Sequence, residues 1–213
     1  MIDNRPMEIE TKVSEQYDYL AEIYDRRWHS YVTKTLILLK EYLNLSGNEV
    51  ILDVACGTGE LERMLVNDHP NLQITGVDIS AKMLDVARSK FPSSDRLQFL
   101  KASVNSLPFK DSSFDIVVTA SAFHYFDYPT NALNEMRRVL KPNGKLIVMD
   151  WCRDFWFCQL LDLYLKVVDP AHKKCYTQQE LNNFMGNANF QITDEKRTRP
   201  HLLWEIMIAT GII

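Results

Sequence analysis

The chain has 213 residues, of which 46% are hydrophobic and 24% are charged. This balance is that of a folded globular protein and excludes a disordered or collagen-like chain. The net charge of −4 does not favour a nucleic-acid binder, which usually carries a strong basic excess. No apolar run approaches the roughly 18 residues of a membrane span, and the first residues lack the apolar stretch of a secretory signal. We expect a cytoplasmic protein with no membrane and no nucleic-acid partner.

The four cysteines, at positions 56, 152, 158 and 175, contain no C-x-x-C pair and do not suggest a disulfide framework. A soft metal ion or arsenite held by Cys152, Cys158 and Cys175 is the weaker alternative, because residues six apart do not share one face of a helix. We therefore expect no metal.

Taken in chain order, apolar segments of strand length alternate with segments of helical periodicity. Strands are expected at 50–55, 73–79, 96–102, 114–120 and 145–151, followed by a final antiparallel pair at 190–198 and 200–211. Helices are expected at 61–68, 80–91, 129–140, 155–168 and 177–189. The alternation predicts an α/β fold with a doubly wound, mostly parallel sheet and helices on both faces.

Local signals refine these elements. Ser80 is a predicted helix cap, and Thr177 with Glu180 forms a predicted capping box. The KPNG segment at 141–144 predicts a turn before the fifth strand, with Gly144 at a turn position. Residues 17–36 have helical periodicity and many aromatic side chains, which predicts a helix packed against the core.

In a parallel sheet, ligands bind beyond the carboxyl ends of the strands. The first strand ends in a Gly-x-Gly turn, Gly57 and Gly59, which lets the backbone approach a ligand closely. A dinucleotide fingerprint needs a third glycine where this chain has Glu62, and carboxylates there repel a pyrophosphate. Asp78 ends the second strand and suits a ribose diol, because a carboxylate accepts hydrogen bonds from both hydroxyls. These residues predict a site for a nucleoside that lacks phosphates.

Five segments together resemble the class I S-adenosylmethionine-dependent methyltransferases, in particular the ubiquinone/menaquinone-biosynthesis-like group known as methyltransferase type 11. They read ILDVACGTGELERML, ITGVDISAKMLDVAR, SLPFKDSSFDIVV, SAFHYF and MRRVLKPNGKLIVMDW, and they span roughly residues 50–151. The resemblance implies a seven-stranded sheet with an antiparallel last strand. It also implies S-adenosyl-L-methionine (AdoMet) as methyl donor and S-adenosyl-L-homocysteine as product.

Carried over position by position, the resemblance implies cofactor contacts at Tyr24, Asp53, Ala55, Gly57, Gly59, Asp78, Ile79, Met83, Ser103, Val104 and Thr119. Asp78 matches the acid on the ribose hydroxyls, and Ile79 matches the apolar residue beside the adenine. Ser103 stands where the family often has an Asp that binds the adenine amino group. A hydroxyl lacks the charge, so we expect a loss of about 1 kcal/mol in that contact.

Methyl transfer from a sulfonium is an in-line displacement, and most of its rate can come from proximity and orientation. A base is needed only if the acceptor must lose a proton. His124 follows the fourth strand and is the candidate base. An acceptor pocket is expected from Trp28, His124, Trp151 and Arg153, with the arginine available for an acceptor carboxylate or phosphate.

The resulting expectation is a single methyltransferase domain over residues 1–213. It comprises an N-terminal helical cap (1–45), an AdoMet-binding core (46–151) and acceptor-side helices with the terminal strands (152–213). The predicted function is methyl transfer to a small-molecule acceptor. The alternative is a catalytically silent AdoMet-binding regulator or assembly factor. A nucleotide-dependent oxidoreductase is disfavoured by the missing third glycine. The sequence leaves the acceptor and the oligomeric state open.

Overall fold

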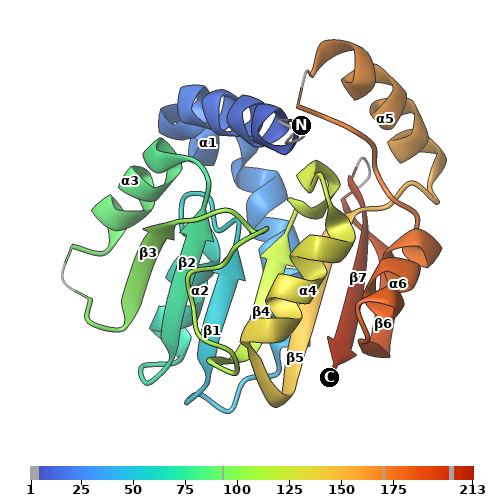
Figure 1. Ribbon diagram of the computed structural model, residues 1–213. Coiled ribbons are helices and arrows are strands. Elements are labelled where there is room, and N and C mark those ends of the chain that lie inside the picture. Colours follow the sequence, from blue (N-terminus) through green and yellow to red (C-terminus); the bar gives the residue numbers. More distant parts are fainter. Residues whose placement is uncertain (1–4, 93, 170, 202–203) are drawn as a thin grey trace.

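Seven strands form one sheet in the computed structural model, which describes residues 5–92, 94–169, 171–201 and 204–213. The strand order is β3-β2-β1-β4-β5-β7-β6 (Figure 1). The first five strands pair in parallel, whereas β7 runs antiparallel to both β5 and β6. The strands are β1 (Val50–Val54), β2 (Gln73–Asp78), β3 (Leu97–Lys101), β4 (Phe114–Ala120), β5 (Leu140–Trp151), β6 (Gln191–His201) and β7 (Trp204–Ile212). The predicted fold class is confirmed; residues 202 and 203, within the predicted last strand, lie outside the described residues.

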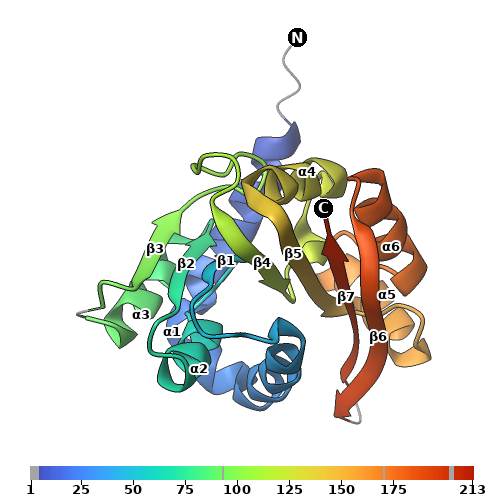
Figure 2. The same cartoon turned by 90° about the horizontal axis from the view of Figure 1, so that it is seen from below.

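Helices cover both faces of this sheet (Figures 1 and 2). They are α1 (Arg5–Leu43), α2 (Glu60–Asp68), α3 (Ala81–Lys90), the short 3₁₀ helix η1 (Phe123–Tyr125), α4 (Pro129–Val139), α5 (Trp156–Val168) and α6 (Gln178–Asn187). Ile51 of β1 packs with α2, α3 and the end of α1, while Leu52 packs with α4 and α6 on the opposite face. Burial of both faces explains why β1 reads as a continuous apolar run.

Two predicted helix caps are confirmed. The Ser80 hydroxyl accepts a hydrogen bond from the Met83 amide at 3.1 Å. Thr177 and Glu180 form a complete capping box at the start of α6. These caps satisfy backbone amides that have no partner within the helix, and they fix where α3 and α6 begin.

The turn predicted at 141–144 lies instead inside β5, which begins at Leu140 rather than at Lys145. The pairing with β4 jumps from Leu140 opposite Phe114 to Lys145 opposite Ile116, so the intervening residues form an irregular excursion. Asn143 has the positive φ of 63°. Gly144 is required for a different reason, because a Cβ there would lie 2.8 Å from the Lys141 carbonyl oxygen.

Helix α1 is longer than the predicted 17–36 segment and is kinked at Trp28, whose φ and ψ are −110° and 15°. Its second part packs into the core through Leu36, Leu39 and Leu43. Its first part lies over the edge of the sheet where the parallel strands end (Figure 1). None of the helices in the described ranges is both long and apolar enough to cross a membrane.

Candidate active site

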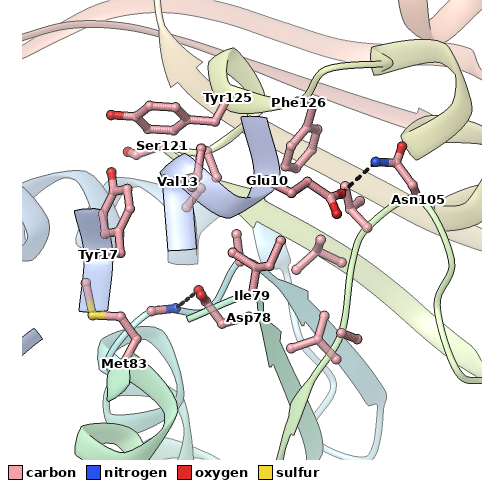
Figure 3. Close-up of a pocket in the computed structure, with 18 of the residues that line it drawn as sticks. Glu10, Val13, Tyr17, Asp78, Ile79, Met83, Asn105, Ser121, Tyr125 and Phe126 are labelled. Carbon is pink, nitrogen blue, oxygen red and sulfur yellow. Dashed lines mark hydrogen bonds between the residues drawn. The ribbon is translucent and has the colours of Figure 1, made fainter. Parts of the chain in front are cut away.

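A cavity lies at the carboxyl ends of the parallel strands, beneath the first part of α1 (Figure 3). It contains about 820 Å³ of empty space, part of it open to solvent. Helix α1 contributes Glu10, Val13, Tyr17 and Tyr24 to its wall. Their spacing of three, four and seven residues places them on one face of a helix. The remaining wall comes from strand ends and the turns that follow them.

The glycine turn after β1 faces this cavity through one of its two glycines. Gly57 has a φ of 55°, and a Cβ built there would meet nothing within 4 Å. Gly59, with a φ of 77°, begins α2, and its Cβ would lie 3.2 Å from Ala87 and 3.3 Å from Phe99. Gly57 therefore leaves room for a ligand, whereas Gly59 lets α2 approach α3 and β3. Ala55 also lines the cavity, with a positive φ of 62°.

Asp78 presents a fixed carboxylate to the cavity at the end of β2. Its oxygens accept hydrogen bonds from the Gly57 amide at 2.9 Å and the Ser80 amide at 2.8 Å. The side chain is buried, and this burial raises the pKa of the carboxyl group. The two amides orient the carboxylate, and its remaining lone pairs are available to hydroxyl groups of a ligand. Ile79 and Met83, which follow it, line the same wall.

A smaller cavity of about 490 Å³ shares Tyr24, Ala55, Gly57, Ala120 and Ser121 with the first, and its wall includes Asp53. Burial, together with Glu62 and Asp78, raises the pKa of Asp53 well above its usual value.

Glu62 lies behind this wall and is fully buried, and neither of its carboxylate oxygens has a partner within the described chain. Burial raises its pKa to about 7. Unpaired buried carboxyl groups favour a ligand that brings positive charge.

Glu10 of α1 lines the cavity, although no sequence pattern predicts it there. Its carboxylate accepts a hydrogen bond from the Ser103 hydroxyl at 2.6 Å. It accepts another from the Asn105 side-chain amide at 2.8 Å (Figure 3). Ser103 itself is outside the cavity lining, whereas Glu10, Val104 and Asn105 are within it. A carboxylate from α1 thus occupies the corner where the resemblance leads one to expect an Asp from the core.

Aromatic side chains form another part of the wall, around Tyr17, Tyr125 and Phe126. The rings of Tyr17 and Tyr125 meet edge to face, with centroids 5.7 Å apart. The Tyr125 hydroxyl donates to Asp169 at 3.2 Å. Burial raises the pKa of both tyrosines, so both stay neutral at physiological pH.

The charged residues of the large cavity are all acidic: Glu10, Asp78 and Asp127. Asp127 is paired with Lys173, which lies outside the lining. Within the described lining there is no Lys or Arg. The wall therefore offers no counter-charge to an anionic ligand.

His124, the predicted base, is placed outside the lining of both cavities. It is 1% exposed. Its Nδ1 lies 2.8 Å from Asp150 Oδ1, and its backbone amide donates to Asp150 Oδ2 at 2.7 Å. The ring stacks on Trp151 at a centroid distance of 4.6 Å. His124 is fixed behind the wall by a carboxylate and an indole.

The other residues predicted for an acceptor pocket also lie outside both linings. Trp28 packs on Tyr24, with ring centroids 4.9 Å apart. The Trp151 indole donates to the Tyr31 hydroxyl at 2.8 Å. Arg153 donates to both carboxylate oxygens of Glu180, at 3.1 and 2.9 Å. Thr119, predicted as a cofactor contact, is fully buried within β4.

Comparisons with known proteins agree with this architecture. The family model described as a methyltransferase domain matches residues 52–148. A demethylmenaquinone methyltransferase of Staphylococcus epidermidis is 30% identical over 201 residues, covering 91% of this chain and 80% of that protein. The Thermotoga maritima protein of the same name is 33% identical over 148 residues, covering 68% of this chain and 60% of its own length.

Among solved structures, a putative methyltransferase from Bacillus halodurans superimposes with a TM-score of 0.68 at 25% identity. The match covers 76% of this chain and 71% of that one. Fold, sequence relatives and family model all agree, and the chain belongs to the S-adenosylmethionine-dependent methyltransferases.

Proposed function

We propose that the cavity beneath α1 binds AdoMet and that the chain transfers its methyl group to a small, uncharged aromatic acceptor. The observation that carries this proposal is the division of the cavity wall. One part presents the hydrogen-bonded carboxylates of Asp78 and Glu10, and another part is aromatic. AdoMet is a nucleoside without phosphates that carries an ammonium and a sulfonium charge, so it suits the first part.

The residues present fit the cofactor. Asp78, held by two backbone amides, is suited to the ribose hydroxyls. Gly57 leaves open space at the glycine turn, and the buried Asp53 in the adjoining cavity is suited to the ammonium group. Glu10, with Ser103 and Asn105 bound to it, supplies an acceptor for the adenine amino group. In this arrangement Glu10 compensates for the serine at position 103.

The cofactor, when bound, supplies an electrophilic methyl group on sulfur. The chain's own contribution is to hold donor and acceptor in line and to exclude water, which is where most of the rate of such reactions arises. The first part of α1 forms the cover. Ser14 donates to the Ile79 carbonyl at 3.2 Å, and Asp18 accepts from the Ser80 hydroxyl at 2.5 Å. These bonds fasten α1 to the turn that carries Asp78.

An aromatic acceptor is supported by Tyr17, Tyr125 and Phe126 on the wall and by the absence of Lys and Arg from the described lining. If the acceptor must lose a proton, Asp127 is the carboxylate that lies on this part of the wall, whereas His124 lies behind it. The named relatives act on demethylmenaquinone, so a reduced quinone is the first acceptor to test. A cytoplasmic location and the absence of nucleic-acid partners remain predictions.

The test is to incubate the full chain with methyl-labelled AdoMet and a panel of acceptors: reduced demethylmenaquinone, simple naphthols and catechols, a phosphorylated phenol and total RNA. We expect label on an uncharged aromatic compound and none on the phosphate or the RNA. Transfer only to an anionic acceptor would contradict the proposal that the cavity wall binds an uncharged acceptor. Binding of AdoMet with no transfer to any acceptor would favour the silent AdoMet-binding regulator.

A further inference from the structure

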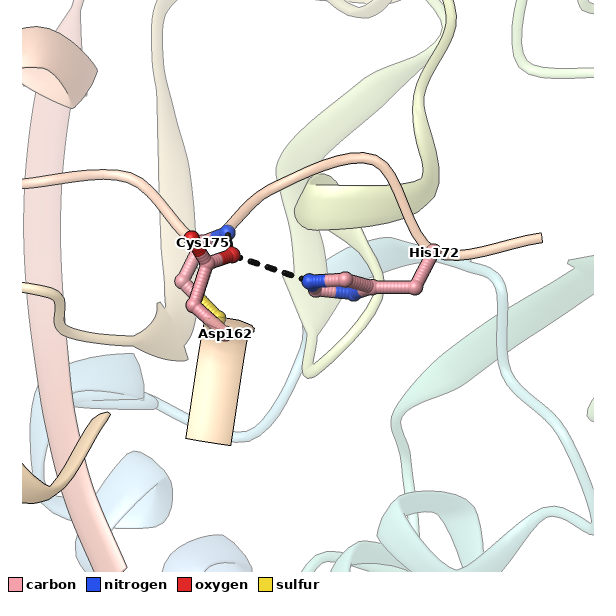
Figure 4. A group of neighbouring side chains, drawn as sticks. All are labelled: Asp162, His172 and Cys175. Carbon is pink, nitrogen blue, oxygen red and sulfur yellow. Dashed lines mark hydrogen bonds and ion pairs between the residues drawn. The ribbon is translucent and has the colours of Figure 1, made fainter. Parts of the chain in front are cut away.

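A second cluster of reactive side chains lies in and after α5, outside the lining of either cavity (Figure 4). It consists of Asp162, His172 and Cys175, all of them buried. One ligand atom from each residue lies within 4.8 Å of the other two. Asp162 belongs to α5, whereas the other two residues belong to the segment that leads into α6.

A second thiol adjoins this cluster. Cys158 is one helical turn before Asp162 and therefore lies on the same face of α5. The Cys158 side chain raises the pKa of the Cys175 thiol, but its sulfur is not among the ligand atoms that lie within 4.8 Å of one another. The two cysteines are 2% and 0% exposed. The three grouped residues are spaced D-x9-H-x2-C, in which a helical carboxylate faces a short H-x-x-C loop.

His172 carries an independent sign of a missing partner. One ring nitrogen, Nε2, lies 2.9 Å from Asp162 Oδ1. The other, Nδ1, is buried and has no hydrogen-bond partner. Buried polar atoms nearly always have a partner, and an exception needs an explanation such as an unseen ion or water. An ion shared with Asp162 would be bound by Nε2, the nitrogen that faces this carboxylate; Nδ1 would then carry the proton, and its missing partner is explained by an unseen water.

The donor set selects the kind of cation. A sulfur and an imidazole suit a borderline-soft ion such as Zn²⁺ and do not suit Mg²⁺ or Ca²⁺, which prefer oxygen. In a tetrahedral zinc site the ligand atoms lie roughly 3.4–3.8 Å apart. Side-chain shifts of about 1 Å would therefore close the present arrangement around an ion.

The charges of the ligands match that of a divalent ion, because one thiolate and one carboxylate carry two negative charges. Lys166, whose Nζ lies 2.7 Å from Asp162 Oδ2, pairs with the oxygen of this carboxylate that does not face His172. Buried charges are tolerated only when they are paired in this way.

We propose that Asp162, His172 and Cys175 bind one zinc-type divalent cation, which fastens α5 to the segment that follows it. This segment begins next to Asp169, which accepts from Tyr125 of the cavity wall at 3.2 Å and from Gln16 of α1 at 3.1 Å. The ion thereby stabilises the support of the aromatic wall without touching either substrate. The site does not depend on the identity of the methyl acceptor.

The first experiment measures zinc in the full chain, purified through a tag that does not bind metal and without chelators. The protein is then incubated with Zn²⁺ and desalted. We expect about one zinc per chain, and replacement by Co²⁺ should give the thiolate charge-transfer absorption of a tetrahedral sulfur-containing site. Less than about a tenth of an equivalent of zinc, or a Co²⁺ spectrum without thiolate bands, overturns the proposal.

The second experiment identifies the ligands by competition with a chelator. Cys175→Ser and His172→Gln should each weaken Zn²⁺ binding at least about tenfold, whereas Cys56→Ser, a cysteine outside the cluster, should leave Zn²⁺ affinity unchanged. Unchanged affinity in both cluster variants contradicts the assignment. If these variants do not fold, the zinc content and the Co²⁺ spectrum of the unaltered chain decide the question.

Discussion

Aspartates near β1 and β2 face the cavities, whereas aspartates near β5 and α5 are bound to histidines. On the side of β1 and β2, Asp53 and Asp78 lie on cavity walls and leave oxygen atoms available to a ligand. On the side of β5 and α5, Asp150 and Asp162 are bound by His124 and His172 and turned inward. A carboxylate after a strand therefore indicates closeness to the ligand edge, but its hydrogen-bond partners decide whether it serves the ligand or the core.

The largest expected effect belongs to Asp78. Asp78→Ala removes the proposed hydrogen bonds to the ribose, each worth about 1.5–3 kcal/mol when one partner is charged. We expect the dissociation constant of S-adenosylhomocysteine to rise at least about 100-fold by calorimetry. Asp85→Ala, an exposed acid on α3 that pairs with Arg88, is the control. A change of less than about threefold in Asp78→Ala would show that this carboxylate does not hold the ligand.

The variant Glu62→Gln tests whether Glu62, near β1 and β2, is a buried acid without a partner. Folding raises the pKa of its carboxyl from 4.5 to about 7, so the folded state favours the protonated form. The wild-type stability contributed by this group is complete below pH 4.5 and is lost as the pH rises through 7. Glu62→Gln should remove this dependence, gaining about 2–3 kcal/mol over wild type between pH 5 and pH 8.5 in urea unfolding without ligand.

The stability contributed by Glu60 should depend on pH in the opposite direction, so Glu60→Gln provides the comparison. Ion pairs with Arg63 and Lys90 hold the pKa of Glu60 below its usual value, so its contribution is lost as the pH falls. If the free energies of unfolding of wild type and Glu62→Gln changed with pH in the same way, Glu62 would not be a buried, unpaired acid.

Glu10 tests whether α1 takes part in adenine recognition. We expect Glu10→Gln to weaken S-adenosylhomocysteine binding about tenfold, the effect of one charge-assisted hydrogen bond. An analogue that lacks the adenine amino group should bind wild type and variant equally. The exposed Glu15 on the same helix provides the control, Glu15→Gln. If Glu10→Gln weakened the binding of both ligands equally, Glu10 would act by holding α1 over the cavity rather than by recognising adenine.

The smallest effect is expected at His124. His124→Asn keeps a donor close to the position of Nδ1, so the bond to Asp150 can persist while the imidazole is lost. Methyl transfer should then keep its rate within about threefold and its pH profile unchanged, because the ring does not line the cavity. Loss of activity together with loss of the pH dependence would restore His124 as the base.

The fold could be predicted from the sequence because strand burial, helix periodicity and caps are local signals. The walls formed by Asp78, Ile79, Met83 and Val104 could be predicted because they follow strands whose ends meet at one edge. Glu10 and Tyr17 could be found only from the spacing of one helix face, since nothing in the sequence states which face of α1 lies over the cavity.

The positions of the side chains near β5 and α5 could not be predicted from the sequence. Trp151 and Arg153 follow a strand and have suitable chemistry, but Tyr31 and Glu180, distant in sequence, bind them away from the cavity. The direction of such side chains depends on long-range partners, which periodicity does not reveal. The cluster of Asp162, His172 and Cys175 is likewise assembled by the path of the chain after α5.

The central claim is that the cavity beneath α1 is an AdoMet site rather than a dinucleotide site. Titration calorimetry of the full chain with AdoMet, S-adenosylhomocysteine and NAD tests it most directly. We expect AdoMet and S-adenosylhomocysteine to bind at one site per chain and NAD to produce no binding heat. Absence of binding by both AdoMet and its product, or displacement of either by NAD, would contradict it.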